Sequence, residues 1–242
     1  MNYMESNQRK YNSLDVDSRA VATAGFMTRV YQWMFIGVLL TAGISTYIGT
    51  NEQLAMSIAA NRGLFWVLVI AQIGVVIGLS AMINKMSTAM ALGLFFLYSA
   101  LTGVTLSVIF LMYTQASIQS AFFTTAIGFG GLSAFGFFTK RDLGPIGTFC
   151  SMGLFGLIGY SLLAFFFPAM MGGAAGLVFS LVGLLIFAGL TAYDTQKIKT
   201  MGQMARSDEE RSKISVIGAL TLYLDFINLF MIILRFTGDR RR

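Results

Sequence analysis

Histidine is absent from this chain, and Cys150 is its single cysteine. One cysteine cannot form an internal disulfide, and without histidine the usual thiol and imidazole ligand sets for zinc are missing. Charged residues are also scarce, at 12% of 242 residues, whereas soluble domains carry about 25%. Any metal chemistry must therefore use oxygen ligands, and an ordinary soluble domain is excluded.

Long apolar runs take the place of the missing charge. Hydrophobic residues make up 56% of the chain, and the mean hydropathy is +0.71. A helix needs about 20 apolar residues to cross a bilayer, and seven runs approach that length: 30–49, 64–83, 89–112, 118–138, 146–167, 173–193 and 214–236. These runs predict an all-α polytopic membrane protein, a seven-transmembrane-helix bundle whose partner is the lipid bilayer. We expect no nucleic-acid partner.

Polar segments at both ends divide the chain into three parts. Residues 1–29 contain no apolar core of the kind a signal peptide needs, so we expect a cytoplasmic N-terminal tail and a first span that acts as its own targeting signal. Residues 30–236 form the seven-span membrane domain, and 237–242 a basic C-terminal tail. We interpret the glycines of "GFGG" (128–131) and "GLFGLIG" (153–159) as sites of close helix packing without a functional role.

Basic residues predict the orientation, because they are retained on the cytoplasmic side. With the N-terminus inside, that side collects nearly all of the loop lysines and arginines, against only Arg62 outside. Seven crossings would place Arg235 and the final "RRR" outside, against this rule. Either that cluster is tolerated or the last segment is re-entrant; we favour a full crossing because 214–236 is long enough.

Asp225 lies inside the last apolar run, in "LTLYLDFINLF", and Asp194 lies at the end of the sixth. An acid at mid-membrane costs at least about 2.5–3.5 kcal/mol, so it normally faces protein or water and marks a pathway or proton site. Helical spacing places Asp225 on one polar stripe, with Ser215, Gly218, Thr221, Asn228 and Arg235. A similar stripe carries Asp194, with Gly176, Ser180, Gly183, Phe187 and Thr191.

Two such stripes could meet and bring the carboxyl groups together. Two carboxylates in a poorly solvated site cannot both be charged cheaply, so they titrate in coupled steps. The protonated pair would share a hydrogen bond and close the helices, whereas the deprotonated pair would repel or attract a cation. The alternative for Asp194 is an ordinary residue of the membrane interface, followed at helical spacing by Lys197.

Several motifs together resemble the Bax inhibitor-1 family, in the form found in the bacterial inner membrane. They are "SALTGVTLS" (99–107), "FTKRDLG" (138–144), "GLTAYDTQKIK" (189–199), "GALTLYLDFINLF" (218–230) and "LRFTGDRR" (234–241). The resemblance implies a fold with the last helix at the centre of the other six. It also implies that Asp194 and Asp225 are the family's paired aspartates, a pH-sensitive site for calcium leak.

The resemblance also implies a latch residue that holds the closed state. Bacterial relatives place an arginine at the cytoplasmic end of the second span, where it pairs with an aspartate in the closed state. The matching residue here is Lys85, in "AMINKMS". Lysine can neutralise a carboxylate but cannot form the bidentate pair that arginine makes.

Three functions follow as hypotheses. The first is a pH-sensitive calcium leak gated by the aspartate pair, with Thr191, Thr221 and Asn228 as supporting oxygen ligands, since calcium prefers six to eight oxygens. It needs no cofactor. The second is a non-conducting regulator that binds a membrane protease or stress-response partner through its tail. The third, an intramembrane aspartyl protease, is disfavoured: "LYLD" replaces the required Gly-x-Gly-Asp, and Pro145 and Pro168 are too early for the Pro-Ala-Leu motif. We therefore expect no enzyme.

Overall fold

Helices make up nearly all of the described chain. The computed structural model describes the backbone of residues 2–167 and 172–241, and their side chains from residue 20 onward. Along the chain lie α1 (Asn2–Gly49), α2 (Glu52–Ala60), α3 (Arg62–Met82), the 3-10 turn η1 (Ile83–Lys85), α4 (Thr88–Leu106), α5 (Ile109–Met112), α6 (Gln115–Phe138), α7 (Gly144–Phe166), α8 (Gly173–Met204) and α9 (Asp208–Thr237). Seven of the segments found there are long and apolar enough to span a membrane, which confirms the predicted fold class.

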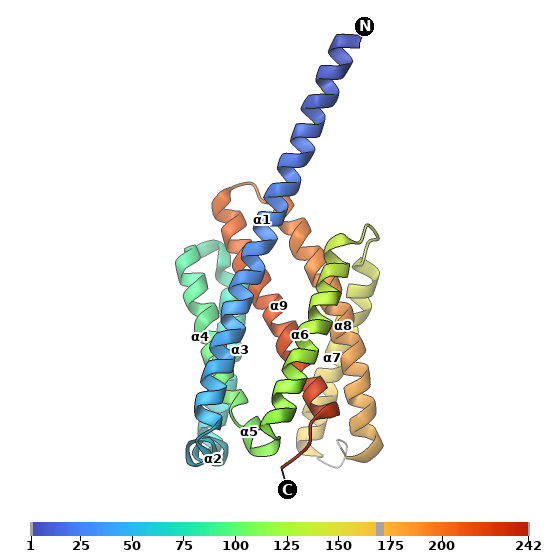
Figure 1. The fold of residues 1–242 in the computed structure, drawn as a ribbon. Helices are drawn as coiled ribbons and strands as arrows, with labels where there is room; N and C mark the ends of the chain where they lie inside the picture. Colours follow the sequence, from blue (N-terminus) through green and yellow to red (C-terminus); the bar gives the residue numbers. More distant parts are fainter. Residues whose placement is uncertain (1, 168–171, 242) are drawn as a thin grey trace.

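The last helix, α9, forms the centre of the bundle. It packs against α1, α4, α6 and α8, and 56% of its most apolar stretch is buried, against 39% or less in the other spans. By contrast, α3 and α7 lie at the periphery, with 11% buried. Figure 1 shows α9 running through the middle, behind α1 and α6. The central position expected for the last span is therefore confirmed.

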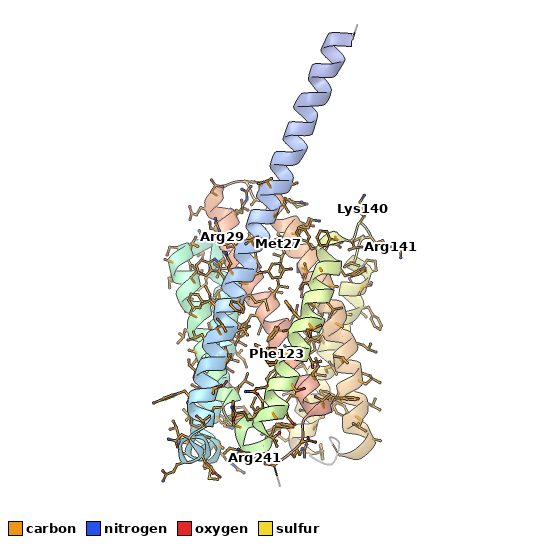
Figure 2. All side chains as sticks on the ribbon, in the orientation of Figure 1. Met27, Arg29, Phe123, Lys140, Arg141 and Arg241 are labelled. Atoms are coloured by element: carbon orange, nitrogen blue, oxygen red, sulfur yellow. The ribbon has the colours of Figure 1, made fainter. Side chains whose placement is uncertain are left out.

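The two ends of the chain lie at opposite ends of the bundle (Figure 1). Helix α9 crosses its full length, so the last segment is not re-entrant. Beyond it, the backbone N–H of Thr114 donates to Asp239 O (3.1 Å) and that of Arg241 to Met112 O (3.0 Å), so the C-terminal tail is held against the connection before α6. Arg29, Lys140 and Arg141 lie at the other end, as Figure 2 shows.

The predicted N-terminal tail and the first span form one uninterrupted helix, α1. Packing against the bundle begins before residue 30, because Phe26 and Met27 are 5% and 2% exposed. The part of α1 that precedes them projects beyond the other helices (Figure 1).

The expected packing role is wrong for most of the glycines named above. Side chains added at Gly128, Gly130, Gly131, Gly156 or Gly159 would meet nothing within 4 Å. Close helix approach occurs elsewhere: a Cβ on Gly136 would strike the backbone of Ala192, and one on Gly147 would strike the ring of Tyr193. Glycine clustering in sequence therefore does not locate the helix contacts, because it does not reveal which face is turned inward.

Candidate functional site

A groove of about 1140 Å³ runs between α3 and α7, with α8 and α9 as its floor. Its walls are mainly aliphatic and aromatic, and Trp66 of α3 and Phe165 of α7 meet across it with ring centroids 5.9 Å apart. The polar and charged residues that line it come chiefly from the floor: Tyr193, Asp194, Lys197, Thr221, Asp225, Asn228 and Arg235. The groove therefore combines an apolar entrance with a polar floor.

The polar stripe of α9 lies partly in this groove. Thr221, Asp225, Asn228 and Arg235 line it. Ser215 and Gly218, one to two turns earlier, do not: Ser215 is 1% exposed, and a Cβ on Gly218 would meet Ile198 of α8 at 2.7 Å. A straight stripe drifts around a helix of 3.6 residues per turn, so its two ends face different neighbours.

Asp225 is the most deeply buried charged residue in the described chain, with 4% of its surface exposed. Its Oδ2 atom has no hydrogen-bond partner among the described residues. The two nearest polar side chains on α9 donate to their own helix instead: Thr221 to Ile217 O (3.0 Å) and Asn228 to Leu224 O (2.8 Å). A buried carboxyl group without a donor must be neutral or balanced by a cation.

Asp194 is partly exposed and lies one helix away, on α8. Both carboxyl groups line the same groove and are close enough for Asp225 to feel the charge of Asp194. Lys197, one turn further along α8, is close enough to attract Asp194, and its Nζ lies 5.7 Å from the centre of the Tyr193 ring. The pair predicted from the two stripes is thus brought together in one groove.

The other predicted site residues are placed differently. Lys85 ends the turn η1 with an exposed side chain, is not among the residues that line the groove, and forms no ion pair with either aspartate in the described chain. Thr191 is fully buried and donates to Phe187 O (2.7 Å), also outside the groove. Thr221 and Asn228 do line it.

Two basic residues in the groove were not assigned a role from sequence. Lys197 was visible only as a helical neighbour of Asp194, and Arg235 only as the far end of the α9 stripe. The signal that could have found Lys197 is a cation three residues from an intramembrane acid, whereas Arg235, ten residues beyond Asp225, carries no such signal. No sequence signal points to Trp66, whose position depends on how α3 packs.

A buried polar network holds the other side of α9. The Tyr223 ring is fully buried, and its hydroxyl group contacts that of Thr41 on α1 at 2.6 Å. Thr41 in turn donates to Ser99 O on α4 (2.8 Å). These bonds fix the rotation of α9 about its axis, and with it the direction in which Asp225 points.

Comparison with known proteins gives consistent matches over most of the chain. Residues 23–242 match the family model described as "Inhibitor of apoptosis-promoting Bax1". The chain is 46% identical over 218 residues to the inner membrane protein YbhL of Escherichia coli (strain K12), covering 89% of this chain and 92% of that protein. It is 42% identical over 217 residues to a protein of Borreliella burgdorferi (89% and 92% covered), and 37% identical over 229 residues to YrjE of Lactococcus lactis (94% and 96% covered).

Proposed function

Since the chain belongs to the Bax inhibitor-1 family, we propose that it is an integral inner-membrane protein through which a cation, calcium, leaks under the control of pH. The ion is the transported substrate, and no cofactor or catalytic step is involved. The acidic groups of the proposed gate are Asp194 and Asp225, which line the groove between α3 and α7.

One observation carries the proposal: Asp225 is 4% exposed, its Oδ2 atom lacks a partner, and it lies beside a second acid in a groove. A merely structural acid at this depth would be paired with a donor or a base. The unpaired oxygen instead leaves a position for a proton or a metal ion. The two acids come from different helices and line one groove, so occupancy of that position can couple to the separation of α8 and α9.

The donor set suits a weak calcium site. Calcium takes six to eight oxygen ligands, and here two carboxyl groups are supplemented by the Asn228 amide oxygen, the Thr221 hydroxyl group, backbone carbonyls and water. Within the described residues, no cluster of three or more histidine, cysteine, aspartate or glutamate side chains could hold a metal ion. Weak binding favours a leak, because an ion that binds tightly does not leave.

The proton and the ion compete for the same oxygens. When both carboxyl groups are ionised they repel each other and attract a cation, so the pathway conducts. Protonation removes both effects and lets α8 and α9 approach. The flux of calcium is therefore expected to rise with pH.

The test is calcium flux into liposomes that contain the purified protein. Asp225→Asn and Asp194→Asn remove one charge each with little change in volume, and each should abolish most of the flux at neutral pH. Asp208→Asn is the matched control, since Asp208 is a fully exposed acid on the same helix. Unaltered flux in both Asp225→Asn and Asp194→Asn would contradict the proposal.

A second candidate is a regulator that binds a membrane protease or stress-response partner. The projection of α1 beyond the bundle favours it, because a protruding helix offers a surface for another protein (Figure 1). Deletion of residues 1–20 would then abolish crosslinking to a partner in membranes, while Asp225→Asn would retain it. If crosslinked species persist in the deleted protein, or never form, this candidate is wrong.

A further inference from the structure

An apolar hollow of about 430 Å³ lies between α1 and α6, apart from the aspartate groove. Met27 and Tyr31 of α1 and Phe129, Ala134 and Phe137 of α6 line it, and the two hollows share no residue. Both helices are candidate membrane spans, and the residues that line the hollow lie near the ends of these spans, at the end of the bundle from which α1 projects. Figure 1 shows the two helices, α1 and α6, in front of α9.

The hollow owes its depth to small residues on α6. Gly130 lines it and has open space within 4 Å of the position of a Cβ, and Ala134 follows at a spacing of four residues. Among the side chains that the structure describes, none lies within 4 Å of a Cβ placed at Gly130. Because an empty apolar hollow loses dispersion contacts on every wall, hydrocarbon from the membrane is its natural content.

A basic hollow of about 750 Å³ adjoins it at the end of the bundle from which α1 projects. The two share Ala24 and Phe137 as lining residues. Lys199 of α8 and Arg211 of α9 supply positive charge, and no acidic side chain is among the described residues that line this hollow. An apolar hollow thus continues into a cationic one.

Both cations can reach an additional anion. The Nζ atom of Lys199 donates to Phe137 O (2.8 Å) and lies 4.8 Å from the centre of the Phe137 ring, which places it at the junction of the hollows with two donor protons left. The Arg211 side chain is 35% exposed, and its contact with the fully exposed Asp208 is 3.5 Å long. Such an exposed pair contributes little and can yield to a phosphate group.

We propose that the two hollows together bind one anionic phospholipid, with its phosphate group at Lys199 and Arg211 and an acyl chain between α1 and α6. Basic pockets between membrane helices suit anionic headgroups, which are concentrated in the cytoplasmic leaflet, and this is the end of the bundle expected to be cytoplasmic. The lipid would join α1 to α6 and α8. The site uses neither aspartate, so it is independent of the proposed ion leak.

The test counts phosphatidylglycerol molecules retained by the full-length protein, by native mass spectrometry from mixed phosphatidylglycerol and phosphatidylcholine. Gly130→Leu fills the apolar hollow and should abolish the retained phosphatidylglycerol. Gly128→Leu is its matched control on the same helix, because Gly128 also has open space around it but does not line the hollow. Arg211→Gln should weaken retention about fivefold, whereas Arg206→Gln, an exposed control at the same end, should not.

Three results would overturn the site. Equal retention of phosphatidylcholine would remove the role of charge, and equal retention by Gly130→Leu and Gly128→Leu would remove the role of the apolar hollow. Displacement of the lipid by an equal concentration of glycerol 3-phosphate would show a site for free phosphate instead. Thermal unfolding in detergent should be the same for the two leucine variants, which separates lost binding from lost folding.

Discussion

The hydroxyl groups of Tyr223 on α9 and Thr41 on α1 lie 2.6 Å apart in the core of the bundle. Because the single hydroxyl proton of Thr41 goes to Ser99 O, Tyr223 is the donor in this bond. The rings of Phe95 and Tyr98 contact the Tyr223 ring edge to face, with centroids 5.7 and 5.8 Å away. The side of α9 away from the groove is therefore held by α1 and α4.

Tyr223→Phe should destabilise the protein by about 1 kcal/mol, the size of an interhelical hydrogen bond in a membrane protein. The ring stays, so its packing against Phe95 and Tyr98 is retained. Denaturant unfolding in detergent, in a double-mutant cycle with Thr41→Val, measures the coupling. Purely additive effects of the two substitutions would show that the bond contributes nothing.

Gly136→Ala should be more costly than an ordinary glycine replacement. A Cβ there would strike the backbone of Ala192 on α8, and a backbone cannot rotate away, so we expect a loss of about 1–3 kcal/mol. Gly128→Ala is the control on the same helix, and should be neutral or stabilising by up to about 1 kcal/mol because alanine is the better helix former. Equal unfolding midpoints for the two variants would contradict the observed contact between α6 and α8.

Asp225→Leu should stabilise the fold while it removes the proposed function. The substitution replaces a buried carboxyl group, one of whose oxygens has no partner, and a buried polar group without a bond costs about 1–3 kcal/mol. Asp225→Asn keeps a polar group and should gain less. The midpoint of unfolding in detergent at neutral pH measures both, and a loss of stability in the leucine variant would mean that Asp225 has a partner on which the fold depends.

Lys197→Gln should shift the pH dependence of calcium flux, whereas Lys85→Gln should not. Lys197 attracts Asp194, so its removal makes that carboxyl group easier to protonate, and the midpoint of the flux curve moves to higher pH by a few tenths of a unit. Lys85 is exposed and does not line the groove. If Lys85→Gln shifted the midpoint as much as Lys197→Gln, that result would support Lys85 as the predicted latch residue.

Much of the fold could be predicted from the sequence, because a bilayer imposes a length and an apolar content on every span. Each of the seven expected runs corresponds to one candidate span, although 89–112 covers both α4 and α5 and 146–167 ends one residue beyond α7. What the prediction missed is where the first span begins: it was expected at residue 30, after Arg29, whereas the candidate span runs from Ala20 to Gly49, and Phe26 and Met27 pack against the bundle.

For a related reason, only part of the candidate site could be predicted from the sequence. The meeting of Asp194 and Asp225 was suggested by two polar stripes, since helical spacing reports which residues share a face. Spacing does not report which neighbour that face meets. Thr191 is in register with Asp194 but lies outside the groove, whereas Trp66, which carries no such pattern, helps to line it.

The most direct test of the central claim is calcium flux into proteoliposomes measured as a function of pH for the unaltered protein and Asp225→Asn. For the unaltered protein we predict flux that rises with pH through a broad transition, because two interacting carboxyl groups lose their protons in coupled steps. For Asp225→Asn we predict a low flux that no longer changes with pH. A pH-dependent flux of the same size in both proteins would contradict the account.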